Sequence, residues 1–140
     1  MTWPFATSRR VEFRDTDTAG IAHFSTYFLF MEEAEHALLR HAGLTVFQDD
    51  PLGILTWPRV SAKCEYQDAA RFEEVLKIEV GLARLGTKSI TWRFRISRAD
   101  KQLALGEIAA VCCRLVVGQR PQSIAIPEEI RKKLTSYLLR

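Results

Sequence analysis

Polar and apolar residues alternate along several stretches of the chain, which is the pattern of strands with one buried face. The first stretch spans residues 9–14, where Val11 and Phe13 lie on one side and charged residues on the other. Four more extended stretches follow, at residues 58–66, 74–84, 89–97 and 103–117. The last is apolar on nearly both sides and therefore predicts the most buried strand. Short links at Leu85–Thr87 and Ala99–Lys101 predict hairpins.

Helical spacing replaces this alternation from about Ser25 to Ala42. An apolar stripe follows one side of the segment and consists of Tyr27, Phe30, Met31, Ala34, Ala37, Leu38 and Ala42. The opposite side carries Glu32, His36 and Arg40. We expect Ser25 to cap the start of this helix and Gly43 to end it in a left-handed conformation. The segment therefore predicts one long amphipathic helix.

A shorter helix is expected near the end of the sequence, where Pro127 precedes apolar residues at helical spacing, namely Ile130, Leu134 and Leu138. The order is then one strand, a long helix, four meandering strands and a short helix. That order predicts an α+β fold, with a five-stranded antiparallel sheet wrapped around the long helix in a single domain over residues 1–140. The second sheet face and the sheet edges favour a partner chain, so a homodimer or homotetramer is expected.

Composition narrows the class of protein further. The 140 residues are 47% hydrophobic and carry a net charge of +3, without the massed Lys and Arg of a nucleic-acid-binding surface. The first ten residues lack the apolar core of a signal peptide, and no apolar stretch is long enough to cross a bilayer. Three cysteines without CxxC spacing, Cys64, Cys112 and Cys113, are interpreted as reduced core residues. We expect a soluble, cytoplasmic protein without nucleic-acid or membrane partners.

The loop between the first strand and the long helix holds the best candidate chemistry. Asp15 and Asp17 precede a helix N-terminus, whose unpaired N–H groups attract negative charge. Gly20 is expected to leave the backbone amides of residues 21–24 free to converge on a small site. Such an arrangement suits acyl hydrolysis, because a carboxylate can generate a nucleophile while N–H donors hold an oxyanion. On the residues alone, Asp17 suits a turn as well as catalysis, and Asp15 is better suited to fixing the loop.

Other candidate groups carry weaker signals. His23 suits either an acid–base role or a polar lining of the loop. Glu33 and His36 have the spacing of half a carboxylate-bridged metal site, but no matching second helix accompanies them, so a metal is not expected. The GxSxG, P-loop and GxGxxG motifs are absent from the sequence. No cofactor is predicted.

The segment from Val11 to Gly43 resembles the opening of the 4-hydroxybenzoyl-CoA thioesterase-like family of hotdog-fold acyl-CoA thioesterases. The positions that carry this resemblance are Asp15, Asp17, Gly20, Tyr27 and Gly43. Three later segments, residues 58–60, 66–80 and 85–96, resemble the strand lining the family's acyl site, its aromatic and acidic stretch, and its hairpin. The resemblance thus covers nearly the whole chain.

This resemblance implies hydrolysis of an acyl-CoA thioester, with Asp17 as nucleophile or general base. Backbone N–H groups near His23 and Phe24 would polarise the thioester carbonyl. Contacts with the substrate are implied for Gly20, Tyr27, Val60, Ser61, Lys88 and Ser89. Lys88, together with Arg84, would meet the phosphates of coenzyme A. Many members carry His where this chain has Phe24, so a catalytic imidazole is missing unless His23 replaces it.

Two further functions stay open beside an acyl-CoA thioesterase. One is a non-catalytic hotdog module that binds an acyl-CoA or acyl-carrier ligand. The other is a hotdog dehydratase or hydratase, which would need His23 paired with a carboxylate. The expected substrate is a thioester of coenzyme A or of an acyl-carrier protein, and its acyl group is either aromatic or aliphatic.

Overall fold

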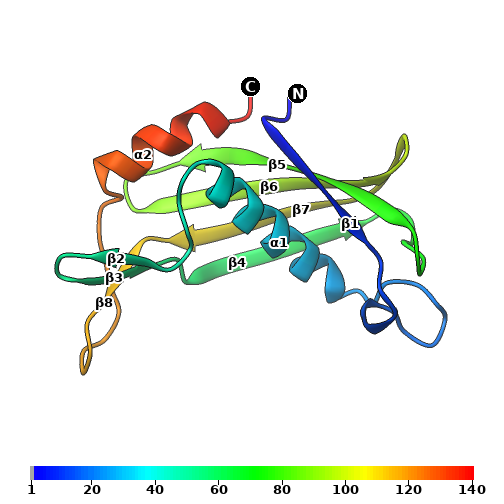
Figure 1. Cartoon of the computed structure of the whole chain (residues 1–140), viewed down its shortest axis with the longest axis horizontal. Coiled ribbons are helices and arrows are strands. Elements are labelled where there is room, and N and C mark those ends of the chain that lie inside the picture. The colour runs from blue at the N-terminus through cyan, green and yellow to red at the C-terminus, as the bar shows by residue number, and fades with distance from the viewer. Residues whose placement is uncertain (1) are drawn as a thin grey trace.

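A computed structural model describes residues 2–140 of the chain. Its main element is a five-stranded antiparallel sheet with the order β1-β5-β6-β7-β4 (Figure 1). These strands span Phe5–Arg10 (β1), Arg59–Tyr66 (β4), Val75–Leu85 (β5), Ser89–Arg98 (β6) and Lys101–Val111 (β7). The long helix α1, Thr26–His41, lies across one face of the sheet (Figure 1). The predicted combination of an antiparallel sheet with few helices is confirmed.

The core forms where the apolar side of α1 meets the sheet. The buried helix residues include Tyr27, Phe30, Met31, Ala34 and Leu38, and those of the sheet include Ile78, Val80, Trp92, Phe94 and Ile96. The absence of a side chain at Gly106 of β7 lets the helix approach closely, because a Cβ atom there would overlap the end of Met31. Each large apolar side chain buried in this way contributes about 1.5–3 kcal/mol to the folded state.

The first strand lies earlier in the chain than the alternation predicts. β1 ends at Arg10, the N–H of Val11 donates to the carbonyl of Glu74 (2.8 Å), and Phe13–Asp15 form a single 3-10 turn, η1. Phe13, expected on the buried side, is 80% exposed. The prediction of a strand over residues 9–14 is therefore wrong beyond Arg10. The chain turns away from the sheet once the N–H of Val11 has bonded to the segment before β5.

A second sheet, which the alternation does not predict, extends from one end of the first (Figure 1). Its strands, in the order β2-β3-β8-β9, span Gln48–Asp50 (β2), Gly53–Thr56 (β3), Cys113–Leu115 (β8) and Gln122–Ser123 (β9). The predicted strand over 103–117 is divided at Cys112 between β7 and β8. It is also not the most buried strand, because β5 holds the longest buried run, from Ile78 to Leu82.

The other predicted elements lie close to their expected positions. Short turns join β5 to β6 and β6 to β7, and Gly43 ends α1 with a φ of +79°. The helix α2, Glu128–Leu134, follows Pro127 and buries Ile130 and Leu134. Leu138 lies outside this helix, after a 3-10 turn at Thr135–Tyr137 (η2), and bridges to Leu82 of β5.

The three cysteines are free thiols, with Cys112 and Cys113 buried and Cys64 half-buried. Within residues 2–140, no three His, Cys, Asp or Glu side chains are grouped so that they could hold a metal ion. None of the helices in the same range is long and apolar enough to span a membrane.

Candidate active site

Asp17 lies in a tight loop between η1 and α1. Its Oδ1 accepts a hydrogen bond from the N–H of Ala19 (2.8 Å), and its carbonyl accepts one from Gly20 (3.0 Å). Gly20 has a φ of +78°, which a residue with a side chain adopts only at a cost. The turn expected for Asp17 is therefore present. Its side chain is exposed, and Oδ2 has no hydrogen-bond partner among residues 2–140, so one carboxylate oxygen is available for chemistry.

The backbone amides after Gly20 are less free than predicted. The N–H of Ala22 donates to Ala70 (2.7 Å), and that of His23 donates to Asp15 (2.8 Å). The N–H of Phe24 makes no hydrogen bond to any of residues 2–140. Two of the four predicted N–H donors are thus already bonded to backbone carbonyls, and Phe24 provides a free N–H donor next to the start of α1.

His23 turns toward Ser25 rather than toward Asp17. Its Nδ1 lies 2.8 Å from Ser25 Oγ, and the N–H of Ser25 donates to the same nitrogen (3.3 Å). Ser25 therefore binds an imidazole and does not cap α1 with its side chain, contrary to expectation. The rings of His23 and Phe24 are stacked at a tilt, 4.5 Å apart. Among residues 2–140 no hydrogen bond pairs His23 with a carboxylate.

Asp17 lies between two cavities. One has a volume of about 490 Å³, and its lining includes Asp17, His23, Phe24, Tyr27 and Tyr66. The other has a volume of about 630 Å³, and its lining includes Asp17, Gly20, Arg14 and the edge-to-face pair Phe13 and Phe72. The carboxylate of Asp17 can therefore be reached by a ligand that occupies either space.

Two tyrosines shape the smaller cavity. The hydroxyl of Tyr66, at the end of β4, donates to the carbonyl of Phe24 (2.7 Å). The hydroxyl of Tyr27 accepts the N–H of Ala70 (3.2 Å), and the two tyrosine rings meet edge to face. Burial, followed by the nearby Cys64 thiol, raises the pKa of Tyr66 to about 12, so its hydroxyl stays protonated and donates. Tyr66 thereby holds the backbone of Phe24 in place.

The other predicted substrate contacts lie at the far end of the sheet. In the strand register, Tyr66 pairs with Ala104, whereas Arg59 pairs with Ala110 and Ser89 with Val111. Val60 is six residues before Tyr66, which corresponds to about 20 Å along a strand at ~3.3 Å per residue. Val60 and Ser61 lie near the start of β4, and Lys88 and Ser89 lie at the β5–β6 turn at the same end. A single chain therefore does not bring these four residues to Asp17.

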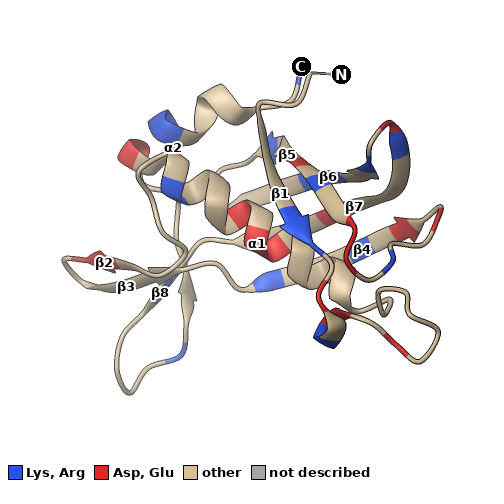
Figure 2. Ribbon diagram, turned by 45° about the vertical axis from the view of Figure 1, so that its right-hand side comes forward, with Lys and Arg blue, Asp and Glu red and all other residues tan. Residues whose placement is uncertain are grey.

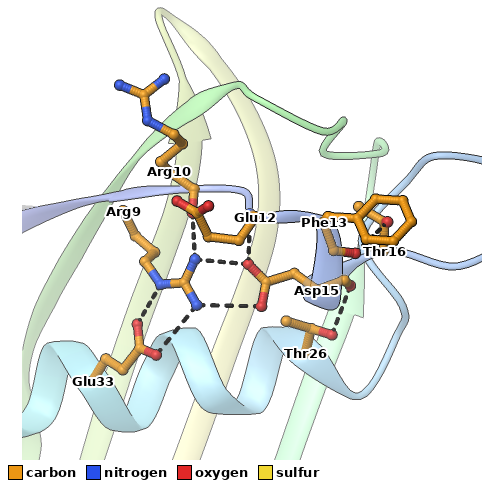
Figure 3. A network of polar contacts seen from close by, with 8 residues as sticks. All are labelled: Arg9, Arg10, Glu12, Phe13, Asp15, Thr16, Thr26 and Glu33. Atoms are coloured by element: carbon orange, nitrogen blue, oxygen red, sulfur yellow. Dashed lines mark hydrogen bonds and ion pairs between the residues drawn. The ribbon is translucent and has the colours of Figure 1, made fainter.

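Asp15 is buried and fixes the loop, as expected, and its ion-pair partner is Arg9 of β1. Arg9 donates from Nη1 to Oδ2 (2.7 Å) and from Nη2 to Oδ1 (3.2 Å), and the N–H of Glu12 also donates to Oδ2 (2.8 Å) (Figure 3). Burial acts to raise the pKa of Asp15, but these donors outweigh it and hold the pKa below its ordinary value. Asp15 is therefore a buried, charged anchor.

Sequence reasoning missed Arg9 because it placed the first strand too late. In β1 the inward side consists of Phe5, Thr7 and Arg9, and the guanidinium of Arg9 lies over the ring of Phe30, 4.9 Å from its centre. Starting the alternation at Phe5 would have identified Arg9 as an inward-facing charge that needs a carboxylate partner.

A second buried carboxylate, Glu35 on α1, also escaped prediction. It is 1% exposed and is paired with Arg59 at the start of β4, which also contacts Glu32. In Figure 2 the acidic residues of α1 lie between basic positions on β1 and at the start of β4. Burial raises the pKa of Glu35 to about 7, although the Arg59 cation opposes that rise. Its position on the helix stripe beside Ala34 and Leu38 is the signal that would have found it.

Comparison with known proteins identifies the family to which this chain is similar. The family model described as the Thioesterase-like superfamily matches residues 11–134. A putative esterase of Aquifex aeolicus is 29% identical over 131 residues, covering 94% of this chain and 98% of that protein. A 4-hydroxybenzoyl-CoA thioesterase of Pseudomonas sp. is 28% identical over 127 residues, covering 86% and 90%. The crystal structure of a 1,4-dihydroxy-2-naphthoyl-CoA thioesterase from Synechocystis superposes with a TM-score of 0.81 at 21% identity, covering 93% and 94%, which is a likeness of fold.

Proposed function

The chain belongs to the thioesterase-like superfamily, and on this premise we propose that it is an acyl-CoA thioesterase that uses Asp17. The observation that carries the proposal is an exposed carboxylate, with one oxygen unpaired by residues 2–140, where two cavities meet beside the free N–H of Phe24. The two arms of a thioester diverge from its carbonyl carbon. A carboxylate between two cavities can therefore reach that carbon while both arms are accommodated.

Asp17 has two chemical routes to the same products. As a nucleophile, it attacks the carbonyl carbon, the carbon–sulfur bond breaks, coenzyme A leaves as a thiolate, and water then hydrolyses the mixed anhydride. As a general base, it takes a proton from a water molecule that attacks the same carbon. In both routes the N–H of Phe24 donates to the oxyanion. A thiolate leaves without a strong acid, which suits a site where His23 is bound to Ser25.

The substrate contacts expected at Val60, Ser61, Lys88 and Ser89 require a second chain, so the proposal includes a homodimer. Strand β4 is at the edge of the sheet and is exposed over most of its length, with Val60 63% exposed. Antiparallel pairing of two β4 edges would place the start of one strand beside the end of the other. The partner's Val60 and Ser61 would then lie beside Tyr66 and the Asp17 cavity, with its Lys88 two strands further in, about 10 Å away.

This arrangement has a direct test in solution. Light scattering is expected to give twice the mass of the chain for the wild type and a smaller mass for Val60→Lys, because charge on an edge strand opposes pairing. Loss of activity together with loss of the dimer would agree with a site shared between chains. A fully active monomer would exclude the shared site but would leave Asp17 catalysis standing.

The proposal also includes one domain over residues 1–140 and a cytoplasmic location, since three free cysteines suit a reducing compartment. The first substrates to test are aromatic acyl-CoA thioesters, because the Pseudomonas relative is named for one. Aliphatic acyl-CoA and acyl-carrier-protein thioesters complete the set.

The experiment that tests the function is a thiol-release assay over this set of thioesters, combined with calorimetry for those that bind. Release of free coenzyme A with catalytic turnover is the expected result. Tight binding without release would favour the non-catalytic binding module instead. His23→Ala is expected to retain turnover, because its imidazole bonds to Ser25, whereas a dehydratase acting through His23 would lose its activity.

A further inference from the structure

Arg9 is a charged residue on the inward side of β1, where the surrounding side chains are apolar. Only 16% of its side chain is exposed, and its cation lies over the ring of Phe30. Burying a guanidinium is costly unless its donors are matched by acceptors. The acceptors of Arg9 are Asp15, Glu33 and the backbone carbonyl of Arg10 (Figure 3).

The contact between Arg9 and Asp15 is the most constrained of these. Two guanidinium nitrogens meet the two carboxylate oxygens, and Asp15 is 3% exposed. This two-point geometry fixes both the distance and the angle between the side chains. Glu33 also meets two nitrogens of Arg9, but its side chain is half exposed, and an ion pair with an exposed carboxylate contributes less than one with a buried carboxylate. The guanidinium of Arg9 is therefore held chiefly to the carboxylate of Asp15.

The backbone of Asp15 joins the two parts of the proposed site. Its carbonyl accepts the N–H of His23 (2.8 Å) and the hydroxyl of Thr26 (2.9 Å), the first residue of α1. These two bonds fix the chain on either side of Phe24. Asp17 follows Asp15 by two residues, so a single anchored residue sets where both the carboxylate and the free N–H of Phe24 lie.

We propose that Arg9 is a positioning residue of the thioester site, which acts through Asp15 to hold Asp17 and the Phe24 N–H in register with each other. This inference rests on the proposed function, since it names what keeps that site assembled. Arg9 also neutralises the charge of Asp15. Without it, a buried carboxylate two residues from Asp17 would keep the N–H donor of Glu12 but lose its counter-charge, and the loop would move to solvate it.

The test is a double-mutant cycle on wild-type, Arg9→Gln, Asp15→Asn and the double variant, with kcat and KM measured for an acyl-CoA that the wild type cleaves. For Arg9→Gln we expect kcat to fall on the order of 100-fold, as a displacement of about 1 Å at a reacting group does. KM should change less than kcat, because Arg9 lines neither cavity. The double variant should lose no more than the more damaging single variant.

Two controls separate positioning from general loss of structure. Arg10→Gln changes the neighbouring arginine, whose guanidinium reaches the carbonyl of Glu73 (3.3 Å) and no acidic side chain among residues 2–140, and should leave kcat unchanged. Arg9→Lys should keep part of the kcat that Arg9→Gln loses, and added guanidinium ion should restore part of the kcat of Arg9→Ala. A variant that was inactive because it had unfolded would show no such recovery.

The outcomes for the two proposals are distinguishable. If the wild type cleaves no thioester, the proposed function fails. If the wild type is active and Arg9→Gln keeps its kcat, or if the losses from Arg9 and Asp15 simply multiply, the positioning role is overturned while the function stands.

Discussion

Glu35 provides a prediction in which stability, rather than activity, reports on a buried charge. Its side chain lies within the helix–sheet core, facing Arg59 of β4 and near Glu32 and His36 of α1. Burial raises its pKa from 4.5 to about 7, because ionising a carboxylate there is costly even beside Arg59. A carboxyl group whose pKa is raised in the folded state stabilises that state at low pH. This contribution is complete below the unfolded pKa and is lost as the pH rises through about 7.

The magnitude follows from the difference between those two pKa values. At roughly 1.4 kcal/mol per pH unit, the contribution of Glu35 changes by at most about 3 kcal/mol between pH 4.5 and pH 8. Glu35→Gln removes the titration and keeps the size of the side chain, and its one carbonyl oxygen can still accept a hydrogen bond from Arg59. The unfolding free energy of the variant, relative to wild type, should therefore rise by up to this amount as the pH increases from 5 to 8.

The assay is urea unfolding at a fixed protein concentration over this pH range, since association would otherwise add to the measured stability. Glu32→Gln is the matched control, because Glu32 contacts the same Arg59 nitrogen but is about half exposed. Its difference from wild type should stay nearly constant between pH 5 and 8. Parallel curves for Glu35→Gln and wild type between pH 5 and 8 would refute a pKa near 7 and would show that Arg59 keeps Glu35 ionised throughout this range.

Two further pairs of substitutions test the oxyanion donor and the smaller sheet. Phe24→Ala keeps the backbone N–H and should retain most of kcat, whereas Phe24→Pro removes it and should lower kcat on the order of 100-fold or more; equal losses in both would exclude this donor. Gly53→Ala should lower the unfolding free energy by about 1–3 kcal/mol, because its Cβ would overlap the carbonyl of Leu115 in the adjacent strand. Gly118→Ala, where only a φ of +80° opposes a side chain, should cost about 1 kcal/mol; a larger loss there than at Gly53 would contradict the packing argument.

The elements that sequence predicted well are those with a long, uninterrupted period. The helical stripe from Tyr27 to Leu38 places α1 within a residue or so of its observed ends, because one face of it must be buried. The first strand was predicted too late in the chain because Val11 and Phe13 continue the alternation after β1 has ended. The second sheet was missed because its first hairpin, residues 48–56, contains Asp, Pro and Gly and resembles a loop.

Some features of the candidate site could also be predicted from the sequence, and others could not. Local sequence predicts the Asp17 turn, the left-handed Gly20 and the role of Asp15 in fixing the loop. It does not predict which amides are free, because Ala70, 48 positions after Ala22, occupies one of them. Nor does it predict that Lys88 lies far from Asp17, because the distance between them depends on the order of the strands in the sheet.

Coenzyme A release by Asp17→Asn is the decisive measurement for catalysis by Asp17. Asn keeps the size of the side chain and the hydrogen bond from Ala19, but it provides neither a nucleophilic nor a basic oxygen. With a thioester that the wild type cleaves, kcat should fall by a factor on the order of 100 to 10,000. The affinity for that thioester should stay within about twofold, since the cavity walls are unchanged, and Asp49→Asn on β2 should behave as wild type. An Asp17→Asn variant that releases coenzyme A at the wild-type rate would exclude Asp17 as the catalytic group.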